Sequence, residues 1–257
     1  MKKETKGMII VAAAVLAVFG IAYVGVIVYA GTSSPFYTVE SESMMHSENS
    51  RIGIIDVGDM VIIRDTSKAN ITTYVEGRGN GYAKFGDFGD VIVYSRPGGT
   101  PVIHRAMLYV EYAGLDSGVR TWNVPSLAGY GGVWYINGVR GDAAAAGAPM
   151  SGVLRFEGLG WAERTVEINL NTLAASGYIT MGDNNSVPDA GVVSKDRIIG
   201  VASIEIPWLG CIKLYATGNN TDKIPMNSVL MLILSLSMIV IAVVAVTVLY
   251  GRRKQKK

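Results

Sequence analysis

The sequence has 257 residues, enough for one sizeable globular domain with accessory segments, and a formal net charge of +2 at pH 7. Apolar residues make up 49% of it, more than a soluble domain usually needs. When the eight Lys and Arg residues at the two ends and Glu4 are set aside, 15 basic residues remain against 20 acidic ones. This acidic balance argues against a nucleic-acid-binding function.

Two long runs account for the excess of apolar residues. Residues 8–30 and 226–250 carry no charged side chain, and as helices both are long enough to cross a hydrocarbon core of about 30 Å. Basic residues lie before the first run, in 1–7, and after the second, in 251–257. The positive-inside rule therefore predicts a cell-membrane protein with two spans, both termini in the cytoplasm and the intervening domain outside.

The first run also resembles a cleavable signal peptide, because Val-Tyr-Ala at 28–30 has the small residues of a cleavage site. Its 23 uncharged residues, however, exceed the roughly 7 to 15 apolar residues of a signal-peptide core. We therefore favour an uncleaved anchor.

The segment between the runs is predicted to be mainly β. Short alternating or β-branched stretches recur between Gly, Asn, Asp and Pro, and no stretch there shows sustained helical periodicity. We expect strands at 36–40, 60–64, 91–95, 101–112, 119–124, 133–136, 165–170, 178–181 and 198–206. The expected architecture is a β domain held between an N-terminal and a C-terminal transmembrane helix.

Composition divides this β segment in two. Residues 113–176 are rich in Gly and Ala, most of all at 141–149. We interpret them as an insertion with a flexible loop at its middle. Residues 31–112 and 177–210 remain as the core that would carry the chemistry.

Reactive side chains are few in this segment. The lone Cys211 excludes an intramolecular disulfide, and two histidines without clustered thiols give no zinc-type spacing, so we expect no metal and no cofactor.

Ser41 and Ser43 follow the first span, and a serine that attacks an amide needs a base within hydrogen-bond reach. His46 is so close in sequence to Ser43 that it would rarely aim its ring at the hydroxyl, whereas His104 lies in an apolar strand. We favour His104 as the base, with a purely structural histidine as the alternative.

Five motifs then follow one another in chain order behind the first span. They are Ser-Glu-Ser-Met at 41–44, Gly-Asp at 58–59 and again at 89–90, Val-Ile-His-Arg at 102–105, and Gly-Asp-Asn-Asn at 182–185 with Asp189. Together they resemble the type I signal peptidases, in the archaeal and endoplasmic-reticulum branch. The resemblance covers the first span and residues 36–107 and 177–206, and leaves the insertion unmatched.

This resemblance implies a membrane-bound serine endopeptidase that removes signal peptides from exported preproteins at the outer membrane face. Ser43 resembles the nucleophile and Ser41 the residue beside the oxyanion, while His104 stands where the bacterial branch has a lysine base. Asp189 resembles the acid that orients the base, and Asp183 competes for that role. The implied partners are signal peptides of secretory preproteins and membrane lipid; association with the export machinery stays open.

Three departures from the family pattern support a second hypothesis. Glu42 stands where the family usually has glycine, His46 where it has proline, and the stretch 44–58 is longer by several residues. Glycine permits turns that a larger side chain disfavours. The alternative is therefore a catalytically inactive, membrane-tethered binding or surface protein on the same fold.

Overall fold

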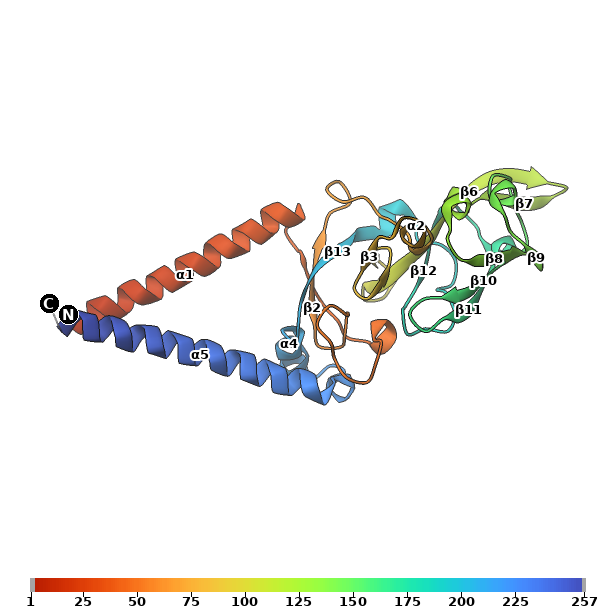
Figure 1. Ribbon diagram of the computed structural model, residues 1–257. Coiled ribbons are helices and arrows are strands. Elements are labelled where there is room, and N and C mark those ends of the chain that lie inside the picture. The colour runs from red at the N-terminus through yellow and green to blue at the C-terminus, as the bar shows by residue number, and fades with distance from the viewer. Residues whose placement is uncertain (1–2, 256–257) are drawn as a thin grey trace.

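The computed structural model describes residues 3–255, and the side chains of 13–248, as a β-rich domain with a long helix at each end of the chain (Figure 1). Helices α1 (Lys3–Ala30) and α5 (Met226–Gln255) extend from the same side of this domain. By length and composition both could cross a membrane, and only 6% of Ala13–Ala30 and 0% of Met226–Val248 is buried. A core helix of a soluble protein would be mostly buried, so these two lack such a role.

An antiparallel seven-stranded sheet, curled into a half-barrel, forms the centre of the domain. Its order is β1-β2-β13-β5-β6-β12, and β7 extends it by pairing with β6. The strands are β1 (Phe36–Thr38), β2 (Met60–Arg64), β5 (Val91–Tyr94), β6 (Val102–Asp116), β7 (Val119–Asn123), β12 (Gly177–Met181) and β13 (Ile198–Ile206). The prediction of a mainly β domain is confirmed.

Both faces of this sheet are covered, as β5 shows most clearly. All four of its residues are buried. Because side chains alternate along a strand, Val91 and Val93 join one apolar cluster, whereas Ile92 and Tyr94 join another on the opposite face. The first cluster also contains Met44, so the sheet fixes the segment that carries the candidate nucleophile.

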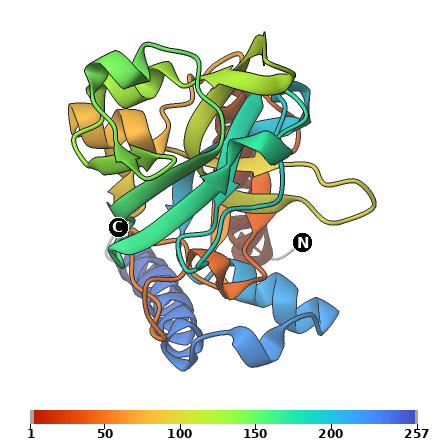
Figure 2. The same cartoon turned by 90° about the vertical axis from the view of Figure 1, so that its right-hand side faces the viewer.

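The predicted insertion forms a second antiparallel sheet that shares the largest core with the first. Its order is β11-β10-β8-β9, from β8 (Val133–Ile136), β9 (Val139–Arg140), β10 (Val153–Leu159) and β11 (Arg164–Asn169). Seen from the end opposite the two long helices, these strands lie in front of the main sheet (Figure 2). Phe156 of β10 belongs to the same cluster as Leu108 of β6 and Ile179 of β12. The boundary expected after residue 112 falls inside β6, which runs on unbroken to Asp116.

Between the two spans, where the sequence shows no sustained helical periodicity, the structure has the three short helices α2, α3 and α4. α2 (Tyr74–Asn80) begins with a capping box between Thr73 and Glu76, a local device that makes a short helix stable without long periodicity. α4 (Gly210–Thr217) packs Cys211 and Leu214 into a cluster near the start of α5. The remaining short elements are η1 (Glu42–Met44), β3 (Ala83–Lys84), β4 (Asp87–Phe88), η2 (Pro125–Gly129), α3 (Ala143–Ala146), η3 (Leu170–Thr172), η4 (Lys195–Arg197) and η5 (Thr221–Lys223).

The stretch 141–149, expected as a flexible loop, contains the single-turn helix α3. Asp142 caps it by accepting a hydrogen bond from Ala145 N. Ala146 and Met150 are buried in the largest core. The stretch is therefore attached to the domain at Ala146, while most of its other residues are exposed.

Candidate active site

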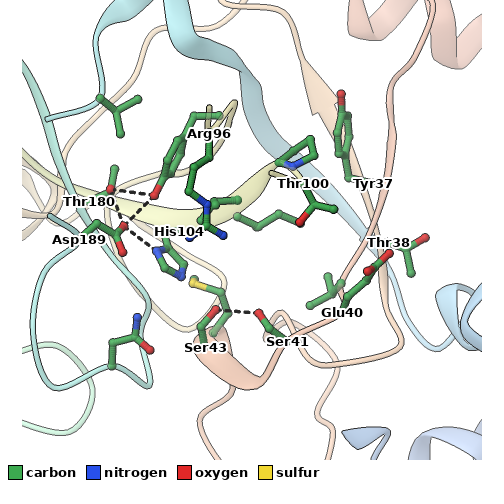
Figure 3. A pocket seen from close by; sticks show the side chains of 18 of the residues that line it. Tyr37, Thr38, Glu40, Ser41, Ser43, Arg96, Thr100, His104, Thr180 and Asp189 are labelled. Carbon is green, nitrogen blue, oxygen red and sulfur yellow. Dashed lines mark hydrogen bonds and ion pairs between the residues drawn. The ribbon is translucent and has the colours of Figure 1, made fainter. Parts of the chain in front are cut away.

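Ser43, His104 and Asp189 come from three separate segments and line one cleft of about 840 Å³ (Figure 3). Ser43 lies in η1, His104 in β6, and Asp189 in the loop that follows β12. Ser41, Tyr94 and Thr180 line the same cleft. The structure thus brings together four of the five residues that the sequence indicated for catalysis.

Contacts on two sides fix the backbone around Ser43. The neighbouring Met44 is 1% exposed and packs in the core beneath β2 and β5, which leaves Ser43 on the cleft side of the turn. The Ser43 carbonyl accepts a hydrogen bond from Asn184 N at 2.7 Å. The hydroxyl groups of Ser41 and Ser43 lie 3.1 Å apart. The two serines therefore form a hydrogen-bonded pair at the cleft.

His104 is oriented by a carboxylate. Its Nδ1 lies 2.7 Å from Oδ2 of Asp189, and the residue as a whole is 7% exposed. The same oxygen accepts hydrogen bonds from Thr180 Oγ1 at 2.6 Å and from Tyr94 OH at 2.8 Å. With Nδ1–H donating to Asp189, Nε2 of His104 is left as a proton acceptor.

The three donors keep Asp189 ionised. Burial by itself would raise the pKa of Asp189, but the hydrogen bond and charge of His104, with the bonds from Thr180 and Tyr94, outweigh burial and lower it. Burial raises the pKa of Tyr94, and the charge of Asp189 raises it further, so this phenol stays a donor. The network therefore presents a fixed negative charge behind the imidazole.

Nε2 of His104 lies on the side of its ring toward Ser43 (Figure 3). Gly182 permits this approach, because a Cβ there would lie 2.9 Å from Nε2 of His104 and 2.6 Å from the Ser43 carbonyl oxygen. Among the described residues, no hydrogen bond joins the Ser43 hydroxyl to His104. Nucleophile–base contacts of this kind are often long before substrate binds and shorten in the complex.

Asp183 lies against other partners than His104. Its carboxylate accepts hydrogen bonds from Arg105 Nε at 2.8 Å and Arg105 Nη2 at 2.6 Å. His46 Nε2 lies 2.9 Å from the same carboxylate. Burial would raise the pKa of Asp183, but the Arg105 guanidinium outweighs it and lowers that pKa. Asp183 thus holds its loop in place, and Asp189 is the carboxylate that contacts His104.

The two departures at positions 42 and 46 have local structural explanations. Glu42 is exposed, occupies the first position of η1, and is absent from the residues that line the cleft. The His46 ring bonds Asp183 and stacks on Trp161, with 4.8 Å between ring centroids. His46 therefore joins the insertion to the 182–185 loop, and it does not line the cleft.

Two residues of the insertion reach this loop and were not anticipated from the sequence. Arg164 Nη1 donates to the carbonyl oxygens of Asp183 and Asn185, both at 2.7 Å. Trp161 Nε1 donates to the Asp183 carbonyl at 3.0 Å.

Tyr94 and Thr180 were also missed, because nothing in a strand sequence marks a hydroxyl that will face an aspartate. The sequence likewise gives no signal that Trp161 and Arg164 will bind backbone carbonyls.

The two Gly-Asp motifs lie outside the cleft. Asp59 accepts hydrogen bonds from the backbone of Trp208 and Asp56 at 2.8 Å each. Asp90 accepts from Thr72 N and Tyr82 OH. Both aspartates therefore hold loops at strand starts. Among the side chains of residues 13–248, no group of three or more His, Cys, Asp or Glu is placed to hold a metal ion.

Comparison with known proteins identifies no relative of this chain. No family model, no curated protein and no solved structure matches the chain. Inferences about activity therefore start from the geometry of the cleft and from the order of the motifs.

Proposed function

We propose that this protein is a membrane-bound serine endopeptidase that removes signal peptides from exported preproteins. The observation that supports it most is the convergence of Ser43, His104 and Asp189 on one cleft, with His104 Nδ1 2.7 Å from Asp189 Oδ2. A serine, a base and an acid that orients the base are the parts that amide cleavage requires. Their order along the chain is that of the type I signal peptidases.

The proposed chemistry assigns each group one step. Nε2 of His104 accepts the Ser43 proton as Oγ attacks the substrate carbonyl, and then passes that proton to the leaving amine. Asp189 holds the tautomer and stabilises the imidazolium that forms. Ser41, whose hydroxyl lies 3.1 Å from that of Ser43, donates to the developing oxyanion. Water then hydrolyses the acyl-enzyme by the same route.

The cleft suits an extended peptide. One wall comes from β1 and the residues after it, including Tyr37 and Thr38, and the other from Val102 and Ile103 of β6. Ser43 and His104 lie between these walls. A peptide bound in this way would offer backbone groups to the strand edges and alternate side chains to shallow pockets.

We place the site on the outer face of the cell membrane. α1 and α5 would be the two spans, with the basic residues of both termini in the cytoplasm. Only 12 residues separate Ala30, the end of α1, from Ser43. Even fully extended, this segment spans at most about 45 Å. Signal peptides that emerge from the bilayer would thus meet the cleft close to the membrane surface.

The deciding assay uses full-length protein in liposomes with a preprotein that carries an Ala-X-Ala site. Wild type is expected to release the signal peptide, whereas Ser43→Ala and His104→Ala lose cleavage. Ser151→Ala, a serine of the insertion outside the cleft, serves as the matched control. Wild type that binds the preprotein without cutting it would favour the inactive binding protein, and equal cleavage by Ser43→Ala would refute the proposed nucleophile.

A further inference from the structure

A smaller pocket lies against β2, β3 and β13, near the end of α1. Its volume is about 190 Å³, and its lining includes Arg64, Lys68, Lys84, Asp90 and Ser203. The end of α1 lies beside β2 and β13 in Figure 1. Three contacts join this region to the last turn of α1: Lys68 Nζ donates to Val28 O at 2.8 Å, Arg64 lies over the Tyr29 ring at 5.1 Å, and Tyr29 OH bonds Ser203 Oγ.

The charge of this pocket is unbalanced. Three cationic side chains line it against the single carboxylate of Asp90, whose two oxygens already accept from Thr72 N and Tyr82 OH. Lys84 Nζ donates to Ala202 O at 2.7 Å, which leaves two of its three protons for other acceptors. Nε of Arg64 is buried and has no hydrogen-bond partner among the described residues. An anion in the pocket would accept from the free protons of Lys84 and balance the charges of Arg64 and Lys68.

The electrostatics support the same conclusion. Burial lowers the pKa of the Lys84 ammonium, Asp90 opposes this effect, and the neighbouring Arg64 guanidinium adds to it. Like charges brought together in a partly dry site repel one another, so a bound anion would stabilise both cations. Ammonium and guanidinium groups are the side chains that proteins use to bind phosphate.

We propose that this pocket binds the phosphate of an anionic phospholipid headgroup. A cavity of about 190 Å³ admits a phosphate group but no folded partner. The proposal rests on the membrane placement given above, because a spanning α1 would end at the outer leaflet, where headgroup phosphates lie. Tyr29, in contact with both Arg64 and Ser203, is a residue type that favours this depth.

The test measures lipid retention without reference to cleavage. Full-length protein in neutral detergent is titrated with phosphatidylglycerol or phosphatidylcholine, and bound lipid is counted by native mass spectrometry. Wild type is expected to retain phosphatidylglycerol in preference, and Lys68→Gln and Lys84→Gln each to weaken retention about tenfold. Arg140→Gln, which removes an exposed charge of β9, is the matched control and is expected to bind as wild type does.

Each remaining outcome bears on one part of the proposal. Arg64→Lys keeps the charge and is expected to retain more lipid than Arg64→Gln, a comparison that stays informative if the neutral variant folds poorly. Equal retention by wild type, Lys68→Gln and Lys84→Gln would overturn the pocket assignment. Displacement of the lipid by millimolar inorganic phosphate would instead make this a site for the free ion.

Alkaline extraction of the protein from membranes tests the spans separately, and the cleavage assay tests the peptidase, so these failures are distinguishable.

Discussion

Oδ2 of Asp189 receives three donors at once, and one of them is Nδ1 of the candidate base His104, at 2.7 Å. Thr180 and Tyr94 supply the other two, from strands on either side of β6. The aspartate is therefore held by the sheet itself. A carboxylate fixed in this way gives the imidazole one tautomer and one direction.

The first prediction separates the two aspartates of the 182–189 region. Asp189→Asn is expected to lower kcat for preprotein cleavage about 10³-fold, because the amide no longer selects the His104 tautomer with Nε2 free. The Tm of this variant is expected to fall less than that of Asp183→Asn, because the amide oxygen can still accept from Thr180 and Tyr94. Asp183→Asn is expected to lose much more stability than Asp189→Asn and to owe its main defect to that loss. A cleavage rate unaffected by Asp189→Asn would contradict the assigned role.

The second prediction concerns the buried pair between Arg105 and Asp183. Arg105 is 1% exposed and also donates to the carbonyl oxygens of Lys84, Asp87, Phe88 and Gly89. Arg105→Met leaves the Asp183 charge buried and those carbonyls unpaired, and is expected to cost about 3–5 kcal/mol in the free energy of unfolding. Denaturant unfolding measures this loss. Arg155→Met, which breaks an exposed pair with Glu157, should change stability little.

The third prediction tests the insertion. Arg164→Ala removes both hydrogen bonds to the 183–185 carbonyls, so we expect the loop beside His104 to loosen and kcat to fall about tenfold, with KM changed less. Arg164→Lys keeps a donor and should recover part of the rate. Arg155→Ala, on the same small sheet but exposed, is the control. An unchanged kcat in Arg164→Ala would mean that the insertion only packs against the loop.

The fourth prediction is a pH dependence of stability. Burial raises the pKa of Asp59 to about 8 and that of Glu205 to about 7, whereas both groups ionise near 4 in an unfolded chain. The folded protein therefore keeps protons that the unfolded chain has released, and stability falls as pH rises from about 4 to about 8. We expect a lower Tm at pH 8.5 than at pH 5.5. Glu205→Gln should narrow this difference.

The lowered pKa values of Asp183 and Asp189 act in a different range. Their contribution to stability is present above the unfolded value near 4 and is lost only as pH falls further. The two effects therefore do not overlap, and a Tm that is the same at pH 5.5 and 8.5 would count against buried, protonated Asp59 and Glu205.

The sequence predicted the main sheet well because its strands are short, β-branched and bounded by turn residues. Strand β10 was missed although Leu154 and Phe156 alternate with exposed residues, since Arg155 and Glu157 made the stretch read as polar. The helix α2 depends on a local cap at Thr73, which leaves no periodic pattern. A single capping residue can therefore determine whether a short helix forms.

For the candidate site, motif order indicated Ser43, His104 and Asp189, which the structure places in one cleft, but it left Asp183 and Asp189 as competitors. Only the fold distinguishes them, because Arg105 follows His104 in β6 and its side chain reaches Asp183 from the opposite face of the strand. The role of Trp161 and Arg164 could not be predicted, since both bind backbone atoms of a distant loop.

The strand order has a consequence for when the site can form. β13, the last strand made, lies between β2 and β5 and joins the half of the sheet under Ser43 to the half that carries His104. A nascent chain that has not yet reached residue 206 lacks this link. The two halves of the cleft are therefore joined only after β13 has been synthesised, well after the segments that carry Ser43 and His104.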